Sequence, residues 1–416
     1  MATIQPFRGL RPVPELAAEI ASLPYDVMNT EEARKEIEKH PLSFLTVTKS
    51  EATLPEGTDP YSEAVYEKAK ENLDAYVAKG QMKQDPAPCY YIYRQMMDGN
   101  IQIGITACVP VAEYNAGIIK RHELTRAEKE QDRVNHILAT QAQTGPVFLT
   151  YRGRPEIDSY VLHLMSNHKP VYHFRADDGV SNMLYVIDNP LEVRELTYLF
   201  RQVPAFYIAD GHHRCAGAAR VAKERERTDT GVYMIDEMPE YEYVQAVIFP
   251  DRMMHIIDYN RLVKDLAGRT PEQFLQAVGE NFDVVPQDQP VQPRQKHTFG
   301  MYLEGQWYLL TARENSLDGG DLIGSLDVSI LQKNLLEPVL QIGDPRSDQR
   351  IDFVGGIRGL QELVSRVDDD GWAVAFSLYP TSMDEVMAVA DAGKIMPPKS
   401  TWFEPKLRDG LVVHLL

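Results

Sequence analysis

The chain has 416 residues, of which 44% are hydrophobic and 25% charged, and its formal net charge is −18. This length suffices for two domains with substantial cores, and the composition is typical of a globular protein in water. The acidic balance argues against a broad nucleic-acid-binding surface and favours small-molecule chemistry. Three cysteines without paired spacing predict neither a disulfide framework nor a zinc site. With no apolar signal segment and no run of about 18 apolar residues, we expect a cytoplasmic protein without a membrane partner.

The chain opens with short helices around a rigid turn. Proline in the first turn predicts a helix over residues 14–20, and Asn29 ahead of two glutamates begins another. Between them, residues 24–27 (PYDV) form a rigid turn that presents a phenol and an acid, Asp26. By itself this segment is more typical of a structural turn than of a functional site. Residues 61–78 have helical spacing of apolar side chains. These are Ala64, Val65, Ala69, Leu73 and Val77.

A hairpin and a charged loop follow. Residues 89–94 and 101–111 form strands around an Asp-Gly-Asn turn. The spacing of Thr125 and Glu128 is that of a capping box, which predicts a helix over residues 126–141. The loop before this helix carries charges of both signs, at Arg121, His122 and Glu123, and Asp132 and Arg133 lie two turns into the helix. A binding loop and a solvated helix entrance with an internal Asp–Arg pair explain this stretch equally well.

After strands and helices over residues 145–200, the stretch 204–222 (PAFYIADGHHRCAGAARVA) organises the chain. An apolar strand ends at Asp210-Gly211, and an alanine-rich helix follows that should pack closely on its neighbours. A strand, a glycine turn and a helix expose the N–H groups of the helix's first turn, which favour phosphate. Gly211 lets a ligand approach the backbone, Arg214 supplies a guanidinium, and His212 and His213 supply donors or proton carriers. The alternative is that Asp210 only caps the helix and the histidines are surface residues.

The composition shifts near residue 255. Residues 284–296 are rich in Pro and Gln and predict a surface loop, and residues 298–312 predict a hairpin. Helices over residues 325–336 and 382–392, with a strand over 373–379, complete a second α+β unit. We therefore expect domains at residues 1–255 and 256–416.

Two charged stretches occur in this second half. Residues 343–358 contain arginines among glycines, a pattern more typical of a structural turn than of an anion site. Residues 394–410 (KIMPPKSTWFEPKLRDG) form a basic and hydroxyl cluster in an acidic protein, with Lys399, Ser400 and Lys406 as candidate ligand contacts. Its two aromatic residues, Trp402 and Phe403, form either a wall against a base or an anchor to the core.

Several short motifs together resemble the uncharacterised bacterial and archaeal family called domain of unknown function 1015, over nearly the whole chain. They are PYDV at 24–27, RHE at 121–123 with DR at 132–133, ADGHHR at 209–214, and PKST at 398–401 with PKL at 405–407. Members of this family often lie beside serine-biosynthesis genes, but the family has no established reaction.

The DGHHR motif is also similar to the nucleotide motif of the ParB-like/sulfiredoxin superfamily, which includes a free serine kinase. This resemblance implies an α+β fold in which a mixed-sheet nucleotide-binding core with large insertions precedes the second unit. It implies that residues 211–214 hold phosphates, with Asp210 nearby for metal or proton chemistry. The sequence departs from the superfamily in its negative charge, in having no helix-turn-helix domain, and in lacking the cysteine of the sulfiredoxin motif.

These features predict a nucleotide-dependent phosphotransferase acting on a small molecule, with free L-serine as the candidate acceptor. The expected cofactors are ATP or ADP, with CTP as the alternative, and Mg²⁺ held by the carboxylates of Asp210 and Glu123. The predicted catalytic residues are Asp210, His212, Glu123 and Asp26. The predicted nucleotide-binding residues are Gly211, His213, Arg214, Arg121, His122, Arg133, Lys399, Ser400 and Lys406.

Two other functions fit the same residues. The first alternative is a ParB-like regulatory protein that binds a nucleotide without turnover. A metal-dependent hydrolase using His122, His212 and His213 ranks last, because adjacent histidines on one helical turn point apart. The oligomeric state stays open, with a homo-oligomer as one alternative.

Overall fold

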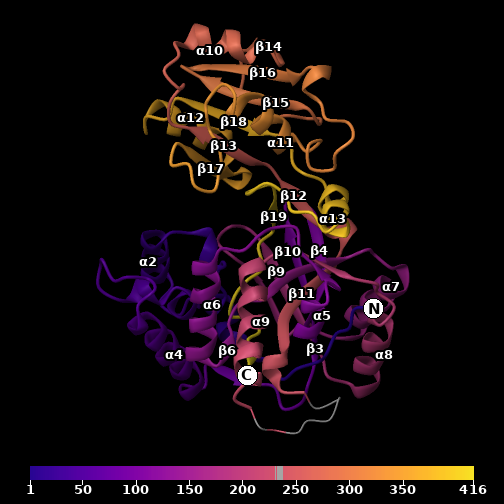
Figure 1. Cartoon of the computed structure of the whole chain (residues 1–416). Coiled ribbons are helices and arrows are strands. Elements are labelled where there is room, and N and C mark those ends of the chain that lie inside the picture. The colour runs from indigo at the N-terminus through magenta and orange to yellow at the C-terminus, as the bar shows by residue number, and fades with distance from the viewer. Residues whose placement is uncertain (230, 232–237) are drawn as a thin grey trace. The chain divides into compact units, whose positions relative to one another are not determined.

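The computed structural model describes residues 1–229, 231 and 238–416 (Figure 1). The chain forms two compact units, Met1–Met254 together with Pro405–Leu416, and His255–Glu404. The change of unit after Met254 lies at the composition shift in the sequence. The chain's last residues differ from the expectation, because residues 405–416 return to the first unit instead of completing the second.

A mixed eight-stranded sheet forms the centre of the first unit. Two neighbouring pairs, β10 with β5 and β11 with β7, are parallel, and the other neighbours are antiparallel. The expected α+β class with a mixed sheet is thereby confirmed. Across the sheet the strands are β5 (Ile119–Lys120), β10 (Phe206–Asp210), β7 (Val147–Tyr151), β11 (Tyr243–Pro250), β4 (Asn100–Pro110), β3 (Tyr90–Met97), β9 (Ser181–Ile187) and β8 (Tyr172–Arg175).

Helices surround this sheet; the later ones share one apolar core with it, and the first four pack into two smaller apolar clusters. They are α1 (Ala17–Ile20), α2 (Thr30–Lys39), α3 (Leu45–Thr48), α4 (Glu63–Ala78), α5 (Val111–Asn115), α6 (Ala127–Thr140), α7 (Pro155–Asn167), α8 (Pro190–Phe200) and α9 (His212–Glu226). Two small antiparallel sheets pair β1 (Leu10–Pro12) with β2 (Met82–Gln84) and β6 (Ala142–Gln143) with β20 (His414–Leu415).

Helices α6 and α9 lie side by side (Figure 1). The two helices are in close contact at Gly217, where an added Cβ would lie 2.8 Å from the Cβ of Arg133. Small residues let two helices approach to this distance, and Cys215, Ala216 and Ala218 beside Gly217 are buried as well. The close packing predicted for the alanine-rich helix is thus confirmed, with α6 as its partner.

Three buried glutamine amides hold the returning C-terminal segment on the sheet. Gln95 on β3 donates to the carbonyl of Lys406, Gln102 on β4 donates to that of Pro405, and Gln245 on β11 donates to that of Val412. A buried carbonyl needs a partner, so these amides specify where the segment lies. Its path places Lys406 beside Asp210 at the end of β10.

The second unit is a six-stranded antiparallel sheet with its own core. Its strands, in order, are β14 (Phe282–Gln287), β16 (Gln306–Ala312), β15 (Thr298–Leu303), β18 (Val374–Leu378), β13 (Tyr259–Val263) and β17 (Ile351–Gly355). A separate pair joins β12 (His255–Ile257) to β19 (Trp402–Glu404). The helices are α10 (Pro271–Val278), α11 (Asp327–Leu331), α12 (Gly359–Asp368) and α13 (Met383–Asp391).

Some local predictions were wrong. Helix α6 has Arg126 at its N-cap without a side-chain cap, because the Thr125 hydroxyl donates to Glu130 instead of capping the helix. Residues 284–287 of the expected loop belong to β14, an edge strand, where a proline costs no sheet hydrogen bond.

The apolar face of α4 is confirmed in part: Val65, Ala69 and Leu73 are buried as predicted, and Ala64 is exposed. Val77 is exposed, and the helix buries Tyr66 and Tyr76 instead. The Tyr76 hydroxyl donates to the Leu42 carbonyl, so a tyrosine can be buried there with its polar end satisfied.

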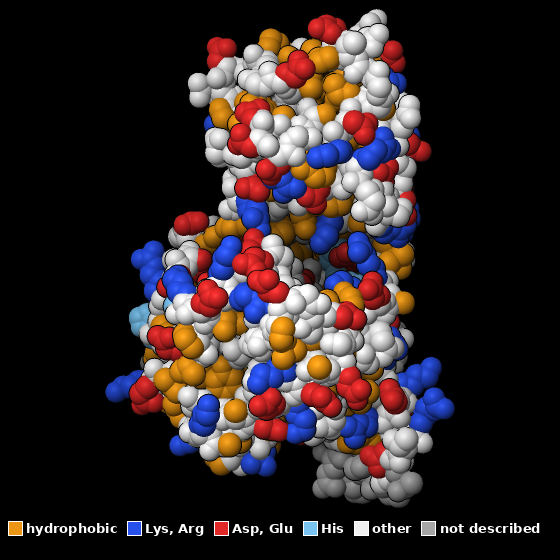
Figure 2. Space-filling model, turned by 90° about the vertical axis from the view of Figure 1, so that its left-hand side faces the viewer, with side chains coloured by type: hydrophobic (Ala, Val, Ile, Leu, Met, Phe, Trp, Pro, Cys, Tyr) orange, Lys and Arg blue, Asp and Glu red, His pale blue; other side chains and the backbone are white. Residues whose placement is uncertain are grey.

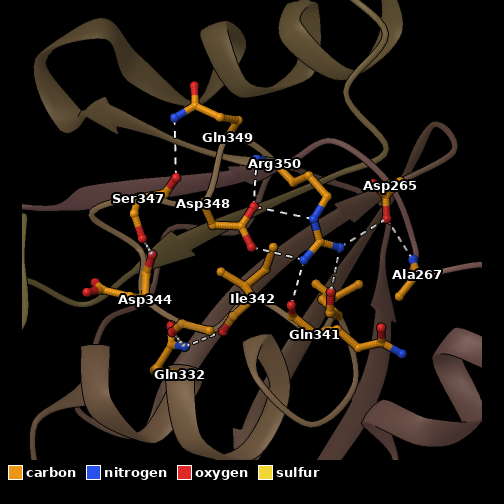
Figure 3. Close-up of polar contacts among 12 residues, drawn as sticks. Asp265, Ala267, Gln332, Gln341, Ile342, Asp344, Ser347, Asp348, Gln349 and Arg350 are labelled. Carbon is orange, nitrogen blue, oxygen red and sulfur yellow. Dashed lines mark hydrogen bonds and ion pairs between the residues drawn. The ribbon is translucent and has the colours of Figure 1, made fainter.

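The arginine-rich turn of the second unit is structural, as the sequence favoured. Arg350 makes an ion pair with Asp348 and donates to the carbonyls of Leu340 and Gln341 (Figure 3). Arg346 pairs with Asp344 two residues earlier. These guanidiniums bond to groups of the same loop, which accounts for their presence there.

One face of the molecule (Figure 2) shows how charged side chains are distributed. On the face shown in Figure 2, basic and acidic side chains are intermixed, and the basic ones do not gather into one area. In the part of the chain that the structure describes, none of the helices combines the length and apolar character needed to span a bilayer.

Candidate functional site

The turn from β10 to α9 has the geometry that the sequence predicted. Gly211 is the N-cap of α9 in the left-handed region, at φ 91°, and α9 has neither a side-chain cap nor an acidic residue in its first turn. A left-handed φ favours glycine over every other residue. The positive end of a four-turn helix is therefore not neutralised by a local cap or a first-turn acid.

Arg214 is folded back against this turn. A Cβ added at Gly211 would lie 3.1 Å from Nε of Arg214, and that Nε is buried without a hydrogen-bond partner among the described residues. The other end of the guanidinium donates to the Pro146 carbonyl and lies 3.9 Å from carboxylate oxygens of Asp26 and Asp210. Arg214 thus lies beneath the turn, where it offsets two acids and leaves one donor unused.

Asp210 is an ion-paired carboxylate. One oxygen accepts a hydrogen bond from the Gly211 N–H at 2.8 Å, and the other accepts from Nζ of Lys406 at 2.8 Å. Burial raises the pKa of Asp210, but the charges of Lys406 and Arg214 outweigh burial and hold the pKa well below its usual value. With both oxygens engaged, Asp210 is poorly placed for the metal or proton role predicted from the sequence.

Two histidines and a glutamate meet at the same end of α9. The rings of His122 and His212 lie edge to face with centroids 4.6 Å apart, and Nδ1 of His212 is 3.9 Å from a carboxylate oxygen of Glu123. His122 is 2% exposed and His212 6%, whereas the Glu123 side chain is 42% exposed. Burial lowers the pKa of His122 to about 4 and that of His212 well below its usual value, so both rings are neutral at pH 7.

Arg133 is engaged in contacts within the first unit. It makes a buried ion pair with Asp132 at 2.7 Å, and its guanidinium lies 3.9 Å from the ring centroid of Tyr25. Tyr25 belongs to a 3₁₀ turn over Tyr25–Val27, and burial raises the pKa of its hydroxyl to about 12. The internal Asp–Arg pair expected for this helix is confirmed, and it fixes the PYDV turn, with Asp26, against α6.

Asp409 is a site residue that the sequence interpretation missed. It is buried, and neither carboxylate oxygen has a hydrogen-bond partner among the described residues. Together with Tyr25, Arg133 and Arg214 it lines a cavity of about 20 Å³, roughly one water molecule in size. Burial raises its pKa to about 7, although Arg214 opposes the shift. Only the return of the C-terminal segment brings it here, so no local pattern marks it.

Four further residues are predicted nucleotide contacts: Arg121, His213, Lys399 and Ser400. The Arg121 guanidinium lies 5.8 Å from the ring centroid of Tyr114 on α5, on the outer flank of α9. Lys399 and Ser400 belong to the second unit, where the Ser400 hydroxyl donates to the Pro397 carbonyl. His213 is partly buried, with its pKa lowered mainly by burial.

The aromatic pair beside Lys399 and Ser400 anchors the loop rather than forming an open wall. Phe403 is buried, and Trp402 packs on Gly355, where a Cβ would lie 2.7 Å from the indole.

The sequence matches the family described as "Protein of unknown function (DUF1015)" over residues 4–329. The chain belongs to this family. Comparison with curated proteins gave no match. The match covers the first unit up to its C-terminal return and about half of the second unit. The residues described above at the β10–α9 turn lie within the matched range, except Lys406 and Asp409.

Distant likenesses to solved structures accompany the family match. A conserved hypothetical protein from Pyrococcus furiosus is 13% identical, with 74% of this chain and 95% of that chain covered and a TM-score of 0.35. A free serine kinase in complex with AMP is 12% identical, with 74% and 91% covered and a TM-score of 0.35. SbnI with a C-terminal truncation, from Staphylococcus aureus, is 11% identical, with 74% and 87% covered and a TM-score of 0.38. Likenesses this distant assign no role to any residue of this chain.

Proposed function

We propose that this family member is a nucleotide-dependent phosphotransferase that acts on a small molecule, with free L-serine as the first acceptor to test. One observation carries the proposal: α9 begins at a left-handed glycine without a cap, beside a buried Arg214 whose Nε lacks a partner. Helix N–H groups and a guanidinium donor at one turn form a site suited to phosphate.

The transfer requires a carboxylate or histidine to accept the acceptor's hydroxyl proton. The hydroxyl oxygen would attack the terminal phosphorus, and the bond from phosphorus to the bridging oxygen would break, leaving ADP from ATP or AMP from ADP. Asp26 and Glu123 are the partly exposed carboxylates near the turn, with side chains 38% and 42% exposed, and either can receive the proton. Mg²⁺ bound with the phosphates would supply charge neutralisation.

Binding is tested first, by thermal shift and calorimetry of the full chain with AMP, ADP, ATP and CTP in the presence of Mg²⁺. Turnover is then tested by incubation with L-serine and detection of phosphoserine by mass spectrometry. Binding without product over long incubation would favour the regulatory alternative. No binding of any of the four nucleotides would overturn the proposal.

Gly211→Ala locates the nucleotide. Alanine at φ 91° is strained, and its Cβ would press on Arg214, so we expect at least a tenfold loss of nucleotide affinity. The matched control is Gly117→Ala, since Gly117 also has a positive φ, of 72°, but an added Cβ meets nothing within 4 Å. Equal affinities in the two variants would place the nucleotide away from this turn.

A further inference from the structure

We infer that His122, Glu123 and His212 form a binding site for a divalent transition-metal ion. Each of the three offers one ligand atom, and these atoms all lie within 4.8 Å of one another. The inference does not depend on the proposed phosphotransferase, and its ligand set differs from the Asp210 and Glu123 pair predicted from the sequence.

Unsatisfied nitrogens carry the inference. Nε2 of His212 is buried without a hydrogen-bond partner among the described residues, and so is at least one ring nitrogen of His122, whose ring also faces the Ile208 backbone carbonyl. A buried polar atom without a partner is costly, so native proteins rarely keep several in one place without a water or an ion. Here they occur on two touching rings with a carboxylate beside them.

The donor set favours a particular class of ion. Two imidazoles and one carboxylate suit Zn²⁺, Co²⁺, Mn²⁺ or Fe²⁺, whereas Mg²⁺ prefers oxygen ligands. Metal binding needs neutral histidines, and burial keeps both rings neutral at pH 7. Three protein ligands leave at least one position open for water or for an oxygen of a bound ligand.

Closure of the site requires only a small movement. Ligand atoms about 2.1 Å from a tetrahedral metal lie about 3.4 Å apart, so separations of up to 4.8 Å must shorten by at most about 1.4 Å. The Glu123 side chain is the most exposed of the three and lies on the loop after β5, so it can move without disturbing the core.

The adjacent-histidine argument against a metal site applies to a different pair. His212 and His213 point apart as neighbours on one helical turn, and His213 is not part of the cluster. His122 comes instead from the loop after β5, and β5 is paired with β10, the strand that leads into α9. The two metal-binding histidines therefore come from different segments that the sheet brings together.

The test uses the full chain without nucleotide. After treatment with EDTA and dialysis, the protein is titrated with Co²⁺ and then with Zn²⁺. Binding is measured by the visible absorption of Co²⁺ and by calorimetry. We expect one ion per chain, displaced by Zn²⁺ and not by Mg²⁺. Glu123→Gln, His122→Gln and His212→Gln should each lower Co²⁺ affinity at least about tenfold. His213→Gln is the matched control, and its affinity should equal that of the wild type.

Glu123→Gln decides the outcome if a histidine variant fails to fold, because this exchange keeps the size of a partly exposed side chain. Absence of Co²⁺ binding by the wild type, or equal affinity in the wild type and Glu123→Gln, would overturn the metal site. Since no nucleotide is present, metal binding and nucleotide binding succeed or fail independently.

Discussion

At the scale of single residues, the site groups the buried Arg214 and Asp409 with the partly exposed carboxylates of Asp26 and Asp210. Arg214 lies between the carboxylates of Asp26 and Asp210, and Asp409 shares a small cavity with it. Burying a charge is costly unless a partner of opposite charge is near, so each of these groups depends on its neighbours. Their pKa values are displaced in opposite directions as a result, downward for Asp210 and upward for Asp409.

Asp409 should make the stability of the protein depend on pH. Its pKa rises from 3.8 to about 7 on folding, so the folded chain binds the proton more tightly than the unfolded chain. The stability from this group is fully present below about pH 4 and is lost as the pH rises through about 7. We expect Asp409→Asn to be more stable than the wild type at pH 8, by roughly 1–3 kcal/mol, and to approach it at pH 4.

Urea denaturation at both pH values measures this difference. Glu128→Gln, which removes an exposed carboxylate on α6, is the control for the loss of one negative charge. A stability difference between Asp409→Asn and the wild type that is the same at pH 4 and pH 8 would show that the carboxyl group does not titrate in this range.

At the scale of elements, the contact between α6 and α9 positions the candidate site. The N-terminus of α9 carries His212 and Arg214, and α6 carries Arg133, which holds the PYDV turn and Asp26. A shift between the two helices would therefore move Arg214 away from the turn that carries Asp26.

Gly217→Ala tests this contact. Alanine is the better helix former by about 1 kcal/mol, yet its Cβ would lie 2.8 Å from the Cβ of Arg133. We expect the steric overlap to outweigh the gain in helix propensity. The variant should lose about 1–3 kcal/mol of unfolding free energy, measured by urea denaturation. The control is Lys223→Ala at an exposed position of the same helix, which should change stability by less than about 0.5 kcal/mol. A Gly217→Ala variant more stable than the wild type would refute the close contact.

At the scale of the whole molecule, the chain leaves the first unit at Met254 and returns to it at Pro405. The returning segment brings Lys406 to Asp210 and Arg408 to Asp178, and its backbone is held by the buried glutamines of β3, β4 and β11. Residues nearly 200 positions apart in the sequence thus form one ion pair. The candidate site is incomplete without the returning C-terminal segment.

A double-mutant cycle on Lys406→Met and Asp210→Asn measures how strongly this ion pair couples the segment to β10. Each single variant removes one member of the pair and leaves the other charge partly buried, so the double variant should be more stable than the sum of the single effects predicts. We expect a coupling of roughly 0.5–3 kcal/mol in unfolding free energy. Effects that add within about 0.3 kcal/mol would show that the pair contributes nothing to holding the segment.

The sequence by itself determined the α+β class, most of the elements, and the turn at Gly211, because each depends on residues close together in the chain. The apolar strand, the glycine and the alanine-rich helix of residues 204–222 specify that geometry locally. Tertiary structure alone decided which ionisable groups meet there. Asp409 and Lys406 reach the turn through the return of the chain, and His122 meets His212 because β5 pairs with β10. Such contacts follow from long-range pairing and burial, which no local spacing of residues encodes.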